Sequence, residues 1–127
     1  MIDISSLVFS RLVNDRTMKK YLKGSGTTRN DTPPAFPYLF MKSLGQPTSV
    51  SDLQNSQCAI KASFEITIYD STSTTKARHL IFLVADLMQM MGFTMNYGPV
   101  EVDRASTTEA YRWIARFSRT YGSDDIL

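Results

Sequence analysis

The chain has 127 residues, of which 43% are hydrophobic and 20% charged, and its formal net charge is +2. A chain of this length hides roughly two thirds of its unfolded surface, which is enough for a hydrophobic core without disulfides or metals. The composition excludes disorder or low complexity over the whole chain and predicts one domain over residues 1–127. No apolar run reaches the roughly 18 residues of a membrane span, and no signal peptide is recognisable. We therefore expect synthesis in the cytoplasm and no membrane partner.

The side chains that usually carry catalysis are nearly missing from the sequence. Cys58 is the single cysteine and His79 the single histidine, and the carboxylates are scattered without a pair that local spacing brings together. The Gly24–Gly26 segment lacks the remaining residues of a phosphate-binding or dinucleotide-binding loop. We interpret Cys58 as a small buried hydrophobe and His79 as a helix-surface or interface residue. These features indicate a binding or structural protein and not an enzyme, with no catalytic residues, no cofactor and no metal.

The N-terminal part of the chain shows a helical pattern that is followed by turn residues. Apolar residues recur at helical spacing over 4–14, with Asp3 as candidate N-cap, and the pattern continues to Leu22 in one helix or in two pieces. Residues 24–34 are rich in Gly, Ser, Thr and Pro, which predicts a flexible loop. A strand is expected over 36–44.

The middle of the chain contains the clearest strand and the strongest helix. Residues 45–57 are polar and predict a long, flexible hairpin loop, functional or disordered. Apolar and polar side chains alternate over 58–69, which predicts a strand with one face on the core. An apolar stripe predicts a helix over 76–91 that ends at Gly92. Because this helix is apolar around most of its circumference, we expect the sheet to cover it on one side and the first helix or another subunit on another.

Two strands and a tail complete the chain. Strands are expected over 93–102 and 109–121, with a turn at 103–108 and a frayed tail at 122–127. In the last strand aromatic residues alternate with arginines, so one face is aromatic and is expected to lie on the helices, and the other is basic. The order of elements predicts an α+β fold, a mostly antiparallel sheet of about four strands with two helices packed on one face.

Three groups of residues are candidates for contact with a partner. Methionines suit an adaptable interface, although core packing is the alternative for them. Arginines on a sheet either form a solvated face or meet the carboxylates or phosphates of a partner. The polar hairpin loop is the third group. The candidate interface residues are Met88 and Met90, then Arg104, Arg112, Arg116 and Arg119, and finally Gln46, Thr48 and Asp52.

Four segments between Ile4 and Phe117 follow one another in a characteristic layout. They are A-F-P-Y-L at 35–39, F-E-I-T-I-Y-D at 64–70, A-R-H-L-I-F-L-V-A-D-L at 77–87 and R-W-I-A-R-F at 112–117. This layout resembles the tail terminator (tail completion) proteins of long-tailed bacteriophages. The resemblance implies a virion protein without catalytic residues that forms a homo-hexameric ring. The ring would cap the tail tube, contact the tail tube protein and the head–tail connector protein, and meet DNA only as cargo passing through its lumen.

Two other functions remain open. Head-completion proteins of the phage neck are similar in size and role, so the layout also fits a neck connector protein. A small nucleic-acid-binding module would use the basic residues of the first helix and the last strand, but a net charge of +2 and the lack of an aromatic stacking set on the basic face weaken this reading.

Overall fold

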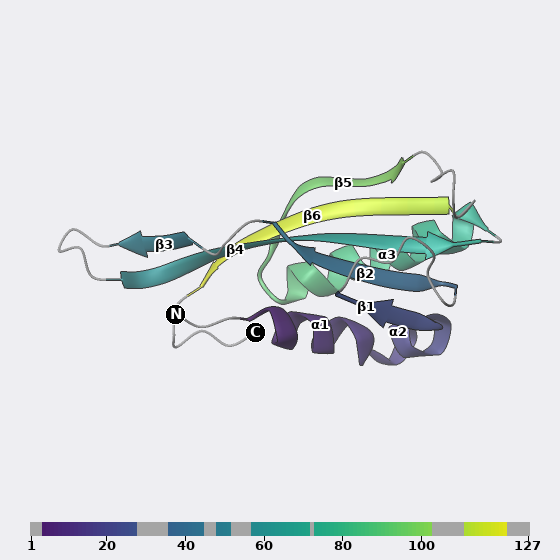
Figure 1. The fold of residues 1–127 in the computed structure, drawn as a ribbon, viewed down its shortest axis with the longest axis horizontal. Coiled ribbons are helices and arrows are strands. Elements are labelled where there is room, and N and C mark those ends of the chain that lie inside the picture. Colours follow the sequence, from purple (N-terminus) through teal and green to yellow (C-terminus); the bar gives the residue numbers. More distant parts are fainter. Residues whose placement is uncertain are drawn as a thin grey trace.

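A six-stranded sheet with helices packed on one face forms the fold (Figure 1). The computed structural model describes residues 4–27, 36–44, 48–51, 57–71, 73–102 and 111–121. The helices are α1 (Ser5–Val13), α2 (Arg16–Tyr21) and α3 (Thr74–Met90). The strands are β1 (Gly24–Gly26), β2 (Tyr38–Ser43), β3 (Thr48–Ser51), β4 (Gln57–Asp70), β5 (Thr94–Val102) and β6 (Tyr111–Tyr121).

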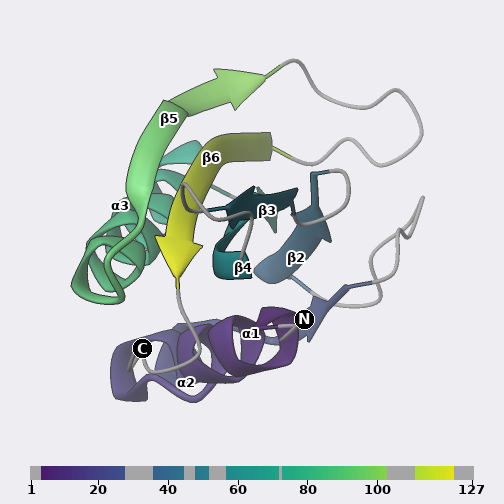
Figure 2. The ribbon, with the colours of Figure 1, turned by 90° about the vertical axis from the view of Figure 1, so that its left-hand side faces the viewer.

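The sheet order is β1-β2-β4-β6-β5, and β3 pairs with β4 beside this path. All pairs are antiparallel except β1 with β2. Figure 2 shows α3 beside β5 and β6, and α1 with α2 beneath β2 and β4, on the same face of the sheet. The predicted α+β class is therefore confirmed, whereas the sheet has two strands more, and the helical layer one helix more, than expected.

The first helical segment is broken at Asp15. The Asp15 carboxylate accepts hydrogen bonds from the backbone N–H groups of Thr17 at 3.1 Å and Met18 at 3.2 Å, which makes it the N-cap of α2. A residue in this role has extended backbone angles, so α1 cannot continue through it. The two-piece alternative is confirmed. The expected cap Asp3 lies outside the described residues, and Ile4 occupies the N-cap position of α1 without a side-chain hydrogen bond.

The glycine-rich segment after α2 contains a strand and not only a loop. Gly24–Gly26 pairs with the start of β2 in parallel, and the N–H groups of Lys23 and Gly24 both donate to the carbonyl of Pro37, at 2.9 and 3.3 Å. This short strand satisfies backbone groups at the edge of β2, and backbone pairing makes no demand on side chains. The loop prediction is thus wrong for 24–26, and residues 28–34 lie outside the described part.

The polar segment before β4 also contains a strand. β2 and β3 both pair with the same edge of β4. β2 pairs with the C-terminal half of β4, where Ser43 lies opposite Phe64, and β3 pairs with the N-terminal half, where Thr48 lies opposite Lys61. A single long hairpin results, and β3 with the start of β4 extends beyond the rest of the sheet in Figure 1. The hairpin-loop prediction is therefore wrong over Thr48–Ser51, because polar side chains do not prevent backbone pairing.

The core lies between the helices and the sheet face that carries alternate residues of β4 and β6. Ala62, Phe64, Ile66 and Ile68 of β4 are buried there, as the alternation predicts. On β6, Ala115 and Phe117 are fully buried, and Trp113 donates its indole N–H to the hydroxyl of Thr74 at 3.0 Å. The prediction that the aromatic face of the last strand lies on the helices is confirmed. Gly92, with φ of 86°, ends α3 as expected.

Candidate interaction surfaces

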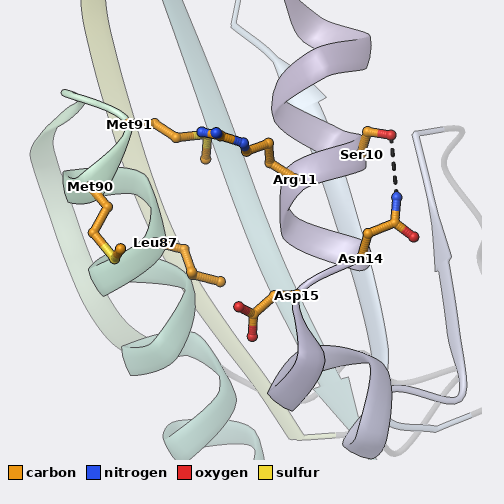
Figure 3. Close-up of a pocket in the computed structure, with 7 residues that line it drawn as sticks. All are labelled: Ser10, Arg11, Asn14, Asp15, Leu87, Met90 and Met91. Atoms are coloured by element: carbon orange, nitrogen blue, oxygen red, sulfur yellow. Dashed lines mark hydrogen bonds between the residues drawn. The ribbon is translucent and has the colours of Figure 1, made fainter. Parts of the chain in front are cut away.

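A hollow of about 680 Å³ lies between α1 and the C-terminal end of α3 (Figure 3). In Figure 3 the Leu87 side chain points into the space between the helices, and Arg11 reaches across it from α1 toward Met91. Met90 stands at the rim and is 81% exposed. The lining residues are Ser10, Arg11, Asn14, Asp15, Leu87, Met90 and Met91.

A second hollow, of about 670 Å³, lies between α2 and the N-terminal half of α3. Its lining residues are Thr17, Tyr21, Ser73, Thr75, Lys76, His79, Leu80 and Leu83. On α3, Lys76, Leu83, Leu87 and Met90 are separated by seven, four and three residues and therefore share one helix face. The two hollows therefore follow one face of α3, which forms one wall of both, and α1 and α2 form the other wall. We call the two hollows together the helical groove.

The structure separates the two candidate methionines. Met88 is fully buried in the core, and Met90 is among the most exposed large apolar residues of the described chain. Two positions along an α-helix correspond to a rotation of about 200°, which turns the two side chains to opposite sides. The expectation of an interface role is therefore wrong for Met88, where core packing holds, and Met90 stays a candidate. His79 is exposed and lines the helical groove, in agreement with its expected place on a helix surface.

The arginine group is divided between the two faces of the sheet. Arg116 lies on the face away from the helices, where its Nε donates to a Glu65 carboxylate oxygen at 2.9 Å and its guanidinium lies 5.1 Å from the centre of the Tyr97 ring. Arg112 shares this face by the period of the strand. Arg119 lies on the other face, and its Nη1 donates to the Met91 carbonyl at 2.8 Å.

Arg119 therefore has a structural role, because it fixes the end of α3 to the sheet. Its side chain joins β6 to the end of α3, where helix carbonyls lack partners within the helix and a cation is favoured. It does not belong to a basic face shared with Arg112 and Arg116, contrary to the sequence-based grouping. Of the remaining candidates, Arg104, Gln46 and Asp52 lie outside the described residues. Thr48 is the first residue of β3, and its backbone lies opposite Lys61.

Reversing the charge of Arg116 is expected to destabilise the fold modestly. Arg116→Glu places a second carboxylate beside Glu65, whose side chain is only 15% exposed, so we expect a loss of about 1 kcal/mol in the free energy of unfolding. Urea unfolding should show a smaller loss at high salt, where the repulsion is screened. The exchanged pair, Arg116→Glu with Glu65→Arg, should recover most of the stability, and Thr120→Glu on the same face is the control. Equal losses in the single and the exchanged variant would contradict the pairing.

Among the residues that the structure describes, no group of three or more His, Cys, Asp or Glu side chains could hold a metal ion. In the same part of the chain no helix is long and apolar enough to cross a membrane.

The helical groove was not found by sequence reasoning. A signal was present: α3 carries more apolar residues than one sheet face can cover, and Leu83, Leu87 and Met90 are the surplus. From these extra apolar residues, the sequence predicted that the first helix or another subunit covers a second side of this helix. The break at Asp15 and the distance between the helices depend on tertiary packing, which periodicity does not reveal.

Comparison with known proteins gives a likeness in fold. No family model matches the sequence, and no curated protein matches it. Among solved structures, the gp17 protein of bacteriophage SPP1 is similar, with a TM-score of 0.53 at 14% identity, over 97% of this chain and 91% of that chain. The chain thus shares its fold, over nearly its whole length, with a bacteriophage protein.

Proposed function

We propose that this chain is a structural subunit of a bacteriophage tail or neck, which forms a homo-hexameric ring at the end of the tail tube and joins it to the head. The observation that supports the proposal most is the likeness to a bacteriophage protein over 97% of the chain. The layout of segments in the sequence supports the same class independently. The proposed partners are further copies of the chain, the tail tube protein and the head–tail connector protein, with DNA passing through the lumen as cargo.

Two features of the fold suit assembly into a ring. A closed ring needs two different patches on each subunit, because each copy contacts its neighbours head to tail. One candidate patch is the outer side of α3, where Met90 is 81% and Phe82 43% exposed. The other is the hairpin arm of β3 and the start of β4, which extends beyond the sheet (Figure 1). We propose that the arm of one copy reaches the helical side of the next.

The Met90→Glu variant tests the ring. We expect the wild type to be monomeric at low concentration and to form rings of about six times the 14.3 kDa monomer mass at high concentration. Met90→Glu should stay monomeric with an unchanged fold, because its side chain is in solvent in the monomer and would be desolvated in the interface. Light scattering gives the mass, and negative-stain imaging gives the shape.

Thr94→Glu, at an exposed position of β5 outside both proposed patches, is the control and should assemble as the wild type does. Wild-type protein that stays monomeric at high concentration and also with a tail tube preparation would contradict the ring. Rings formed equally well by Met90→Glu would place the interface away from α3.

A further inference from the structure

We propose that the helical groove binds an acidic, amphipathic helix of a partner protein, a contact that shares only Met90, at the rim of the first hollow, with the proposed ring interface. The groove has an apolar floor, a cationic rim and an elongated shape, and each property selects one feature of the occupant.

The floor of the groove is apolar. Leu80, Leu83 and Leu87 line it from α3, and Tyr21, which is 42% exposed, lines it from α2. Leu83 and Leu87 are packed on the core from below and are only partly buried. Covering them would remove further apolar surface from water, at about 25 cal/mol for each Å². The occupant must therefore present apolar side chains to the groove.

The rim of the groove is mainly cationic. Arg11 crosses its end near Met91, and Lys76 lines the end near α2. Lys20 of α2 does not line the groove, but its Nζ lies 5.6 Å from the centre of the ring of Tyr21, which does. The structure gives neither Arg11 nor Lys76 an ion pair with another described residue.

Two carboxylates, those of Asp15 and Asp86, lie near these cations and partly offset their charge. The His79 side chain also lines the groove. Asp15 lines the first hollow, but it already accepts two backbone N–H groups as the cap of α2. Asp86 is exposed on the flank of α3. The excess of cations favours an occupant with acidic side chains beside its apolar face.

The shape of the groove fits a helix. α3 has 17 residues and forms one wall over about 26 Å, at 1.5 Å per residue. An amphipathic helix lying in a groove uses apolar residues at positions i, i+3, i+4 and i+7, in the same stripe that α3 presents.

A nucleic acid would contact the rim and leave the leucine floor uncovered. A second copy is disfavoured, because α1 and α2 contain no acidic residue, and α3 contains only Asp86.

A designed peptide tests this proposal. The probe is a fluorescent helical peptide of about four turns, with leucine on one face and glutamate on the other, and the matched peptide has lysine in place of glutamate. We expect saturable binding of the acidic peptide by fluorescence anisotropy and weaker binding of the lysine peptide. Lys76→Glu should raise the dissociation constant about fivefold and Leu83→Ala about tenfold.

Arg78→Glu is the control for the charge. Arg78 is exposed on the side of α3 away from the groove, where its guanidinium lies 5.4 Å from the centre of the Phe82 ring, so this variant should bind as the wild type does. Equal weakening by Arg78→Glu, equal affinity for the lysine peptide, or no saturable binding would overturn the proposal. Displacement of the peptide by duplex DNA would assign the groove to nucleic acid, and self-association lost in Lys76→Glu would assign it to a second copy. Either result overturns the proposal, and none of these results depends on whether Met90→Glu prevents ring formation.

Discussion

Phe117→Ala is expected to lower the free energy of unfolding by about 3–5 kcal/mol. Phe117 is fully buried on β6, directly opposite Phe64 of β4 and Met95 of β5. Truncation removes buried apolar surface and leaves a cavity where the sheet meets α3. Since small domains are stable by only about 5–15 kcal/mol, the variant should be close to the limit of folding.

Urea unfolding followed by tryptophan fluorescence and circular dichroism measures this effect. Phe117→Leu, which leaves a smaller cavity, should lose about 1–2 kcal/mol and serves as the graded control. Ile114 lies on the opposite face of β6, which the described helices do not cover, and it is only partly buried, so Ile114→Ala should lose less than Phe117→Ala. The reverse order would contradict the assignment of the two faces of this strand.

Gly98→Ala is expected to lower the free energy of unfolding by at least about 2 kcal/mol, because two costs combine at this position. Gly98 has φ of 79°, in the region that favours glycine. A Cβ atom there would clash with the Ile114 carbonyl oxygen and lie 3.2 Å from the Ala115 Cα, and both are backbone atoms of the central strand β6. The substitution therefore has to displace β5 from β6.

Gly92→Ala is the matched control for Gly98→Ala. Gly92 has a similar φ of 86°, but a Cβ atom there meets first the Nε of Arg119, at 3.1 Å, which belongs to a flexible side chain. We expect a loss of about 1 kcal/mol, mainly from the backbone angle, because the Arg119 side chain has to shift only slightly to make room. The difference between the two glycine variants in urea unfolding then measures the clash with β6. Equal losses would contradict the close approach of β5 at Gly98.

Displacement of β5 should also change the outer sheet face. The register between β5 and β6 shifts on both sides of Tyr97, and this irregular region places the Tyr97 ring beside the Arg116 guanidinium. An irregular, bulged edge resists continuous pairing with another strand. Gly98→Ala is therefore expected to reduce the solubility of the protein as well as its stability.

The sequence predicts well those elements whose side chains carry a period. β4 alternates without interruption, α3 repeats at 3.6 residues, and the aromatic face of β6 follows the alternation to Phe117. The two missed strands carry no such pattern. β1 is Gly-Ser-Gly and is held through its backbone, and β3 is short and polar and pairs only along the hairpin arm.

The candidate site was predictable only in part. Arg119 has the same parity as Phe117 on β6, a signal that could have assigned it to the helix side of the sheet, away from Arg116, although the sequence-based grouping did not use it. Met90 is exposed and stays a candidate for the interface, whereas Met88 follows the core stripe of α3. The helical groove needed the structure, because no local pattern determines how far α1 and α2 stand from α3.

Electron microscopy of phage particles after disruption of the gene tests the proposed role in the tail or neck most directly. We predict heads and tails that fail to join, or tails without a defined end, and restoration of complete particles when the wild-type chain is supplied. Empty or filled heads that lack only the neck would favour the connector position over the tail end. Complete, infectious particles formed without the chain would contradict a structural role in the tail or neck.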